Sequence, residues 1–196
     1  MGTVTSALAT YATLGLATWT VSAAAAGALR GASTVMAPVN TTFTFIGFAL
    51  LPVVFRTPAA SQIRLVGRIS ALLVACAAAW GGILLALPSG IGRLFLGDTW
   101  AGARSVLPWT TLEYVGLAVY AGLVLGFQAR REARVLAVIS FVDAALVVGA
   151  AVIAAETTTK ASGFAAALAI VSVVSAAGTS VVYYRRLRST RAAPVC

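Results

Sequence analysis

Residues 66–87 read VGRISALLVACAAAWGGILLAL, a nearly continuous apolar run whose single charge, Arg68, lies close to its start. A helix needs about 20 such residues to cross the hydrocarbon core of a bilayer. Apolar side chains would cover every side of that helix, which is typical of a membrane span rather than of an amphipathic surface helix. We therefore interpret this stretch as a transmembrane helix.

The rest of the chain has the same character. Its 196 residues are 60% hydrophobic and 10% charged, with a mean hydropathy of +0.97, whereas about 25% of the residues in a soluble domain are charged. The apolar runs predict an all-α integral membrane protein, with a bundle of six transmembrane helices in residues 1–184 and a basic tail in residues 185–196. The six predicted spans are residues 8–29, 32–54, 66–87, 105–127, 135–155 and 162–184.

Basic residues outnumber acidic ones by 14 to 5, and the net charge is +9. They lie between the apolar runs rather than in one patch, so we expect contact with anionic lipid headgroups and not with nucleic acid. Alternate loops differ sharply in their basic content. An excess of Arg and Lys marks cytoplasmic loops, so both termini are expected in the cytoplasm. The poorer set holds Arg30, Arg93, Arg104 and Lys160, and the richer set holds Arg56, Arg64, Arg68, Arg130, Arg131, Arg134, Arg185, Arg186, Arg188 and Arg191.

The sequence contains no His and two Cys, with Cys76 inside an apolar run and Cys196 at the last position. The absence of His excludes Ser-His-Asp and Cys-His nucleophilic sites as well as His-ligated metal sites. No P-loop or GxGxxG fingerprint occurs either. We therefore expect no enzyme, no cofactor and no bound metal. Cys76 should lie within the membrane, Cys196 should lie in the cytoplasmic tail, and no disulfide should form.

The segment FLGDTWAGARSVLP, between the third and fourth spans, interrupts the apolar pattern with charged residues, Gly and Trp. Pro88 is expected to end the third span, and residues 89–97 are expected to lie on the membrane surface. Asp98 should cap the next helix by accepting hydrogen bonds from backbone N–H groups, while Trp100 and Trp109 should sit near the interface. Two interpretations are open: a capped loop with an aromatic anchor, or a flap over a transport cavity.

Two carboxylates lie inside predicted spans. Glu113 is eight residues into the fourth span and Asp143 is eight residues into the fifth, so each lies about 12 Å from a membrane edge at 1.5 Å per residue. An ionisable residue at a helix centre in the membrane costs about 2.5–3.5 kcal/mol. Each carboxylate is either satisfied by a neighbouring hydroxyl or Arg and serves helix packing, or lines a polar cavity where it carries a proton or contacts a substrate.

The second predicted span is unusually polar, with the sequence STVMAPVNTTFTF near its start. Pro38 lacks a backbone donor, and Asn40 with the neighbouring threonines can either satisfy the freed carbonyl or face water. Arg30 precedes this span. Its side chain either snorkels to the membrane interface or contacts an anion at the mouth of a cavity.

Three segments carry a resemblance to a known family: ALRGASTVMAPVNTTFTFIGFALLPVVFR, LFLGDTWAGARSVLPW and LGFQARREARVLAVISFVDAALVVG. Together they resemble the C-terminal half of bacterial polysaccharide flippases of the O-antigen and teichoic-acid export type. These flippases belong to the multidrug/oligosaccharidyl-lipid/polysaccharide exporter superfamily. The chain has MAPVN where the family pattern has GPLN, and the resemblance covers nearly the whole chain.

The resemblance implies one half of a twelve-helix, V-shaped transporter with a central cavity and cytoplasmic termini. Arg30, Asn40, Glu113 and Asp143 become candidate substrate-binding residues, with Arg30 at an anionic pyrophosphate and the carboxylates at sugar hydroxyls or in proton coupling. The implied function is transport of a lipid-linked oligosaccharide or polysaccharide precursor across the bacterial plasma membrane. The implied partners are the bilayer, the lipid-linked glycan and a second six-helix bundle, from a second copy or a separately encoded half.

Two alternatives stay open beside the flippase interpretation. The chain could be half of a small-molecule or drug exporter of the same superfamily, since one architecture serves several substrates. It could also be a membrane scaffold that transports nothing, in which case its polar residues would only pack helices.

Overall fold

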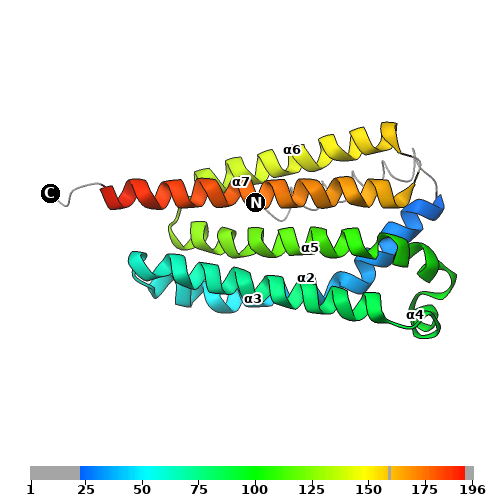
Figure 1. Cartoon of the computed structure of the whole chain (residues 1–196). Helices are drawn as coiled ribbons and strands as arrows, with labels where there is room; N and C mark the ends of the chain where they lie inside the picture. Colours follow the sequence, from blue (N-terminus) through cyan, green and yellow to red (C-terminus); the bar gives the residue numbers. More distant parts are fainter. Residues whose placement is uncertain (1–22, 159, 193–196) are drawn as a thin grey trace.

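The computed structural model describes residues 23–158 and 160–192, and these residues form helices joined by short turns (Figure 1). Five helices in this part of the chain are long and apolar enough to cross a membrane. This confirms the all-α fold and fits a membrane protein. In chain order the elements are α2 (Ala23–Arg56), α3 (Ala59–Ala86), α4 (Ser89–Leu96), the 3-10 turn η1 (Gly97–Thr99), α5 (Trp100–Ala129), α6 (Ala133–Thr157) and α7 (Ala161–Ala192).

The predicted break between the first two spans, at Arg30 and Gly31, is wrong. α2 is a single helix from Ala23 to Arg56 and passes through both residues. Neither residue breaks a helix strongly, and Gly31 packs closely enough on α5 that an added Cβ would lie 3.3 Å from the Cβ of Ala103. Most of the first predicted span, residues 8–22, lies outside the described residues. The six-helix bundle therefore stays a prediction, supported over its last five spans.

α5 lies at the centre of the bundle, where it packs against α2, α3 and α7, and α6 packs mainly on α7. Two clusters of buried apolar side chains pack α5 against its neighbours, one toward each end of the bundle. One cluster includes Met36, Trp100, Leu107 and Phe164, and the other includes Val54, Leu73, Phe127 and Tyr183.

α6 exposes large apolar side chains over most of its surface, among them Val138, Phe141 and Ile153. Its buried residues are the small side chains Ala151 and Ala154. An apolar surface of this kind is stable against acyl chains and unfavourable in water. The outer surface of α6 therefore fits contact with lipid.

The helix directions sort the basic residues between the two ends of the bundle. One end carries the α2–α3 turn, the α5–α6 turn and the C-terminal end of α7, at the left of Figure 1. We call it the basic end, because the described residues of the larger Arg set lie on or near these segments. The opposite end carries the start of α2, α4 and the α6–α7 connection. The larger Arg set thus lies toward one end of the bundle, as predicted, and the assignment of that end to the cytoplasm stays a prediction.

The prediction that Pro88 ends the third span is confirmed, because α3 ends at Ala86 and Pro88 precedes α4. The predicted cap on the next helix is wrong. α5 begins after Thr99 without a side-chain capping bond, and Asp98 lies exposed in η1. The 3-10 turn leads straight into α5, so no carboxylate is positioned over its first N–H groups.

The two tryptophans near the start of α5 differ in their exposure. Trp109 is partly exposed, as an interfacial ring would be, but Trp100 is 2% exposed. Its indole lies against the backbone of Gly92 in α4. Trp100 is therefore a packing residue that joins α4 to α5 and is not an exposed anchor, while its position near the interface stays a prediction.

The C-terminal helix continues further than the last predicted span. α7 runs to Ala192, past the predicted end at Tyr184. The basic tail predicted from residue 185 therefore begins as helix. Arg and Ala are good helix formers, so loss of hydrophobicity alone does not end a helix.

Candidate functional site

A polar stripe runs along the N-terminal two thirds of α2. Its members recur at intervals of three, four and six or seven residues, which places them on one face of the helix. The opposite face of α2 buries Ala32, Met36 and Val39 in the bundle core. The stripe is exposed and consists of Arg30, Ser33, Thr34, Asn40, Thr41 and Thr44.

The hydroxyls of the stripe are satisfied by their own helix. Thr34 donates to the carbonyl of Arg30 at 2.8 Å, and Thr44 donates to the carbonyl of Asn40 at 3.0 Å. Ser33 and Thr41 bond in the same way to carbonyls four residues earlier. Pro38 has no N–H for the carbonyl of Thr34, and none of these hydroxyls bonds to that carbonyl. Of the two alternatives for this face, satisfaction of the freed carbonyl by the threonines is therefore not met.

Arg30 and Asn40 differ from the other members of the stripe. Within residues 23–158 and 160–192, neither side chain has a hydrogen-bond partner or an ion pair, and both are exposed. Asn40 lies at the middle of α2. The ten-residue separation corresponds to about 15 Å along a helix. The Asn40 amide can accept and donate hydrogen bonds to a ligand or to a neighbouring helix, and the Arg30 guanidinium can donate them.

Asp143 lies where α6 packs on α7. The hydroxyl of Ser175 donates a hydrogen bond to its Oδ1 atom. One turn earlier on α6, Ser140 lies 3.4 Å from the Tyr120 hydroxyl of α5. Asp143 thus has a hydroxyl partner of the kind that a packing role requires, yet a carboxylate has acceptor positions left for a proton or a second donor.

Glu113 lies on α5, half-buried beside the same segment of α7. Its backbone carbonyl accepts a 2.8 Å hydrogen bond from the hydroxyl of Ser172. Ser172 and Ser175 are three residues apart on α7, so Glu113 and Asp143 lie against neighbouring positions of one helical turn. The structure thus brings both carboxylate residues to the junction of α5, α6 and α7.

The four predicted site residues therefore form two separate groups. Arg30 and Asn40 share the outer face of α2, and Glu113 and Asp143 flank α7. No hydrogen bond or ion pair joins the groups within the described part of the chain. That same part holds no cluster of three His, Cys, Asp or Glu side chains that could bind a metal ion.

A hollow of about 250 Å³ lies between α5 and α7. Val115, Val119, Val173 and Ala176 are among its lining residues, and Ser180 supplies its one side-chain hydroxyl. A glycan needs many hydrogen-bonding groups, so this apolar hollow is a poor sugar site.

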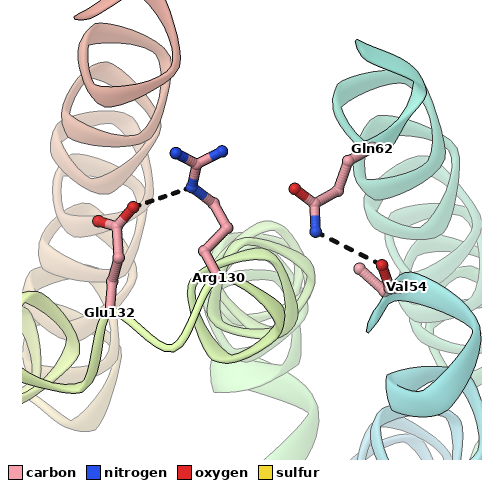
Figure 2. A network of polar contacts seen from close by, with 4 residues as sticks. All are labelled: Val54, Gln62, Arg130 and Glu132. Atoms are coloured by element: carbon pink, nitrogen blue, oxygen red, sulfur yellow. Dashed lines mark hydrogen bonds and ion pairs between the residues drawn. The ribbon is translucent and has the colours of Figure 1, made fainter. Parts of the chain in front are cut away.

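Sequence reasoning missed a polar network at the basic end, part of which Figure 2 shows. Arg130 Nε lies 2.8 Å from Glu132 Oε1, and both side chains are largely buried. Across the bundle, the buried Gln62 of α3 donates to the Val54 carbonyl of α2 at 3.4 Å. A signal was available: Glu132 is the one acidic residue in the basic run ARREAR, where an ion pair is favoured.

The turn that carries this network also holds a strained residue. Arg131 has a φ of 55°, a conformation that side chains other than Gly adopt at a cost. Its guanidinium lies 5.6 Å from the ring centre of Phe55 in α2, a favourable cation–π distance. The ion pair closes the α5–α6 turn on itself and the cation–π contact holds the turn against α2, which are structural roles.

The two groups of site residues offer different chemistry. The α2 stripe presents one cation and one amide without partners among the described residues. The α7 junction holds two acidic residues, of which Asp143 bonds to a serine through its carboxylate and Glu113 through its backbone carbonyl. Comparisons of this chain with protein families, with curated proteins and with solved structures find no match.

Proposed function

We propose that this protein is one half of a transporter that moves a lipid-linked oligosaccharide or polysaccharide precursor across the bacterial plasma membrane. In this proposal the bundle works with a second six-helix bundle, supplied by a second copy or by a separately encoded half. The two bundles form a twelve-helix V with a polar cavity between them. The basic end and both termini face the cytoplasm, in line with the Arg distribution.

The observation that carries the proposal is the position of Asn40. Its amide is exposed at the middle of α2 without a partner in the described part of the chain. Placing an amide against acyl chains without a hydrogen bond costs about 2–7 kcal/mol. A water-filled cavity removes that cost, because the amide stays hydrated until a substrate replaces the water.

Arg30 supports the same placement and suggests the substrate class. It lies on the face of α2 that carries Asn40, about 15 Å away along the helix. A lipid-linked glycan carries an anionic pyrophosphate and many hydroxyls. Arg30 suits the pyrophosphate through charge-assisted hydrogen bonds, and Asn40 suits the sugar hydroxyls.

The carboxylates receive a different role in this proposal. Glu113 and Asp143 repel a pyrophosphate, so they contact sugar hydroxyls or carry a proton that couples transport to the ion gradient. The Asp143–Ser175 bond is compatible with either role, because protonation of the carboxylate lets it donate as well as accept.

A second candidate is a membrane scaffold that transports nothing. It is favoured by the hydroxyls of the stripe, which are all satisfied by their own helix. In that case Asn40 bonds to a neighbouring helix and serves association, as polar residues in membrane helices do. A small-molecule or drug exporter is a further alternative. It would use the same polar cavity but would bind a small molecule in place of the glycan.

Complementation of a bacterial strain that lacks its polysaccharide flippase tests the proposal, with the chain alone and with a second half. Rescue by either arrangement supports transport and tells which second bundle is used. In the rescued strain, Arg30→Ala and Asn40→Ala should each reduce export about 10- to 100-fold, as expected for the loss of about 1.5–3 kcal/mol of hydrogen bonding.

Two variants serve as matched controls. Thr41→Ala alters the same face but removes a hydroxyl that bonds only to its own helix. Lys160→Ala removes an exposed cation in the α6–α7 connection, at the same end of the bundle as Arg30 and outside the stripe. Both should export at the wild-type level. Failure to rescue, or wild-type export by Arg30→Ala and Asn40→Ala that insert normally, overturns the transport proposal and leaves the scaffold role.

A further inference from the structure

The short helix α4 has an orientation of its own. It links the end of α3 to the 3-10 turn before α5 at the opposite end of the bundle. Figure 1 shows α4 nearly end-on, while the long helices run across the picture. α4 therefore lies across the bundle axis. A helix that crosses the axis of a membrane bundle at its end lies along the membrane surface.

α4 is held firmly to α5. A Cβ built on Gly92 would lie 1.9 Å from Cε2 of Trp100, so the indole ring sits directly against the α4 backbone. At the first residue of α4, the Ser89 hydroxyl accepts a 2.9 Å hydrogen bond from Arg104 Nη1. These contacts fix which face of α4 turns away from the bundle.

The face that turns away is strongly apolar. Leu94 is 84% exposed, Phe95 is 75% exposed and Ile91 is 46% exposed. Their spacing of three and four residues places them on one side of α4. Arg93 lies on the other side and is also exposed. An apolar face opposite a cation on a helix parallel to the membrane is the pattern of an interfacial helix.

We propose that α4 is a lipid anchor in the leaflet at the opposite end of the bundle. Ile91, Leu94 and Phe95 insert among the acyl chains near the headgroup boundary. Arg93 reaches the lipid phosphates on the other side of the helix, with its apolar stem along the surface. The occupant of this face is lipid, because α4 is joined directly to two membrane helices and cannot leave the membrane surface.

This anchor is independent of any transport activity. It differs from a flap over a transport cavity, in which the same three side chains would face protein or water. Since Trp100 and Arg104 belong to α5, the anchor also sets the depth of the central helix in the membrane. On α4 the aromatic residue that contacts lipid is Phe95, and the packing of Trp100 on Gly92 joins this helix to α5.

Fluorescence quenching in vesicles tests the anchor. Single cysteines at positions 94 and 93, on opposite faces of α4, are introduced after Cys76 and Cys196 are changed to Ala, and each is labelled with an environment-sensitive dye. The protein is reconstituted in phosphatidylcholine–phosphatidylglycerol vesicles. The dye at position 94 should show blue-shifted emission, strong quenching by acyl-chain nitroxides and severalfold weaker quenching by iodide than the dye at position 93.

Two results overturn the proposal. Equal iodide quenching at both positions would place α4 in water. Protection of position 94 from both iodide and lipid nitroxides would place its face against protein, as a flap requires. Circular dichroism of each variant before reconstitution checks the helical content, and Phe95→Cys provides a second reporter on the same face if the Leu94 variant does not fold.

Discussion

Gly116 of α5 lies close against Ser172 of α7, and Gly116→Ala tests the packing of these two helices. A Cβ built there would lie 2.3 Å from Ser172 Oγ, 2.9 Å from the Ser172 carbonyl carbon and 3.0 Å from its oxygen. The hydroxyl can rotate away, but the carbonyl belongs to the α7 backbone. The two helices must therefore separate to admit a methyl group.

The cost has two parts. Overpacking a well-packed core costs about 1–3 kcal/mol. Separation also stretches the 2.8 Å bond from Ser172 to the Glu113 carbonyl, and hydrogen bonds between membrane helices contribute about 0.6–1.7 kcal/mol. Gly116→Ala should therefore lower the free energy of unfolding by about 2–5 kcal/mol when both terms apply.

Reversible unfolding in mixed micelles with increasing dodecyl sulfate, followed by circular dichroism, measures this change. Gly178→Ala on α7 is the matched control, because nothing lies within 4 Å of a Cβ built there. Its stability should equal the wild type or exceed it by up to about 1 kcal/mol from helix propensity. Ser172→Ala combined with Gly116→Ala should recover only part of the loss, since the carbonyl contacts remain. Equal stability of the Gly116 and Gly178 variants would refute the close contact.

Three further predictions concern other parts of the bundle. Trp80 donates its indole N–H to the Val35 carbonyl of α2 at 2.9 Å, so Trp80→Phe should lose about 1 kcal/mol in the same unfolding assay; an unchanged midpoint would show that the bond contributes nothing. Cysteines placed at Lys160 and at Arg188, in a background without native cysteines, should react with an impermeant maleimide from opposite sides of the membrane, and labelling of both from one side would contradict the topology. Cys76→Ser should leave the mobility on a non-reducing gel unchanged, whereas a shift would reveal a disulfide.

The membrane fold could be predicted from the sequence because lipid constrains the backbone so strongly. Acyl chains offer no hydrogen bonds, so a long apolar run must form a helix that satisfies its own N–H and C=O groups. Pro88 marked a true helix end because it cannot continue α3. The order of the basic residues predicted that most of them lie toward one end of the bundle, because charged side chains stay out of the hydrocarbon core.

Local predictions fail where the polarity of one residue does not mark a helix boundary. Arg30 predicts a loop, but a single Arg does not interrupt a helix, and α2 continues through it. Asp98 predicts a helix cap, but the 3-10 turn η1 leads into α5 without one. The burial of Trp100 could not be predicted either, because it depends on the space that Gly92 leaves for the indole ring.

Composition and the order of apolar runs thus predicted a membrane environment, the long helices and the gathering of Arg residues toward one end of the bundle. Only the tertiary structure decided which face of each helix meets which neighbour. The reason is physical: apolar residues lie on every side of these helices, so periodicity does not reveal a buried face. The faces are set instead by close approaches such as Gly116 on Ser172 and by bonds between distant residues, such as Ser175 to Asp143. Those contacts place Glu113 and Asp143 at α7, whereas Arg30 and Asn40 lie on the exposed face of α2.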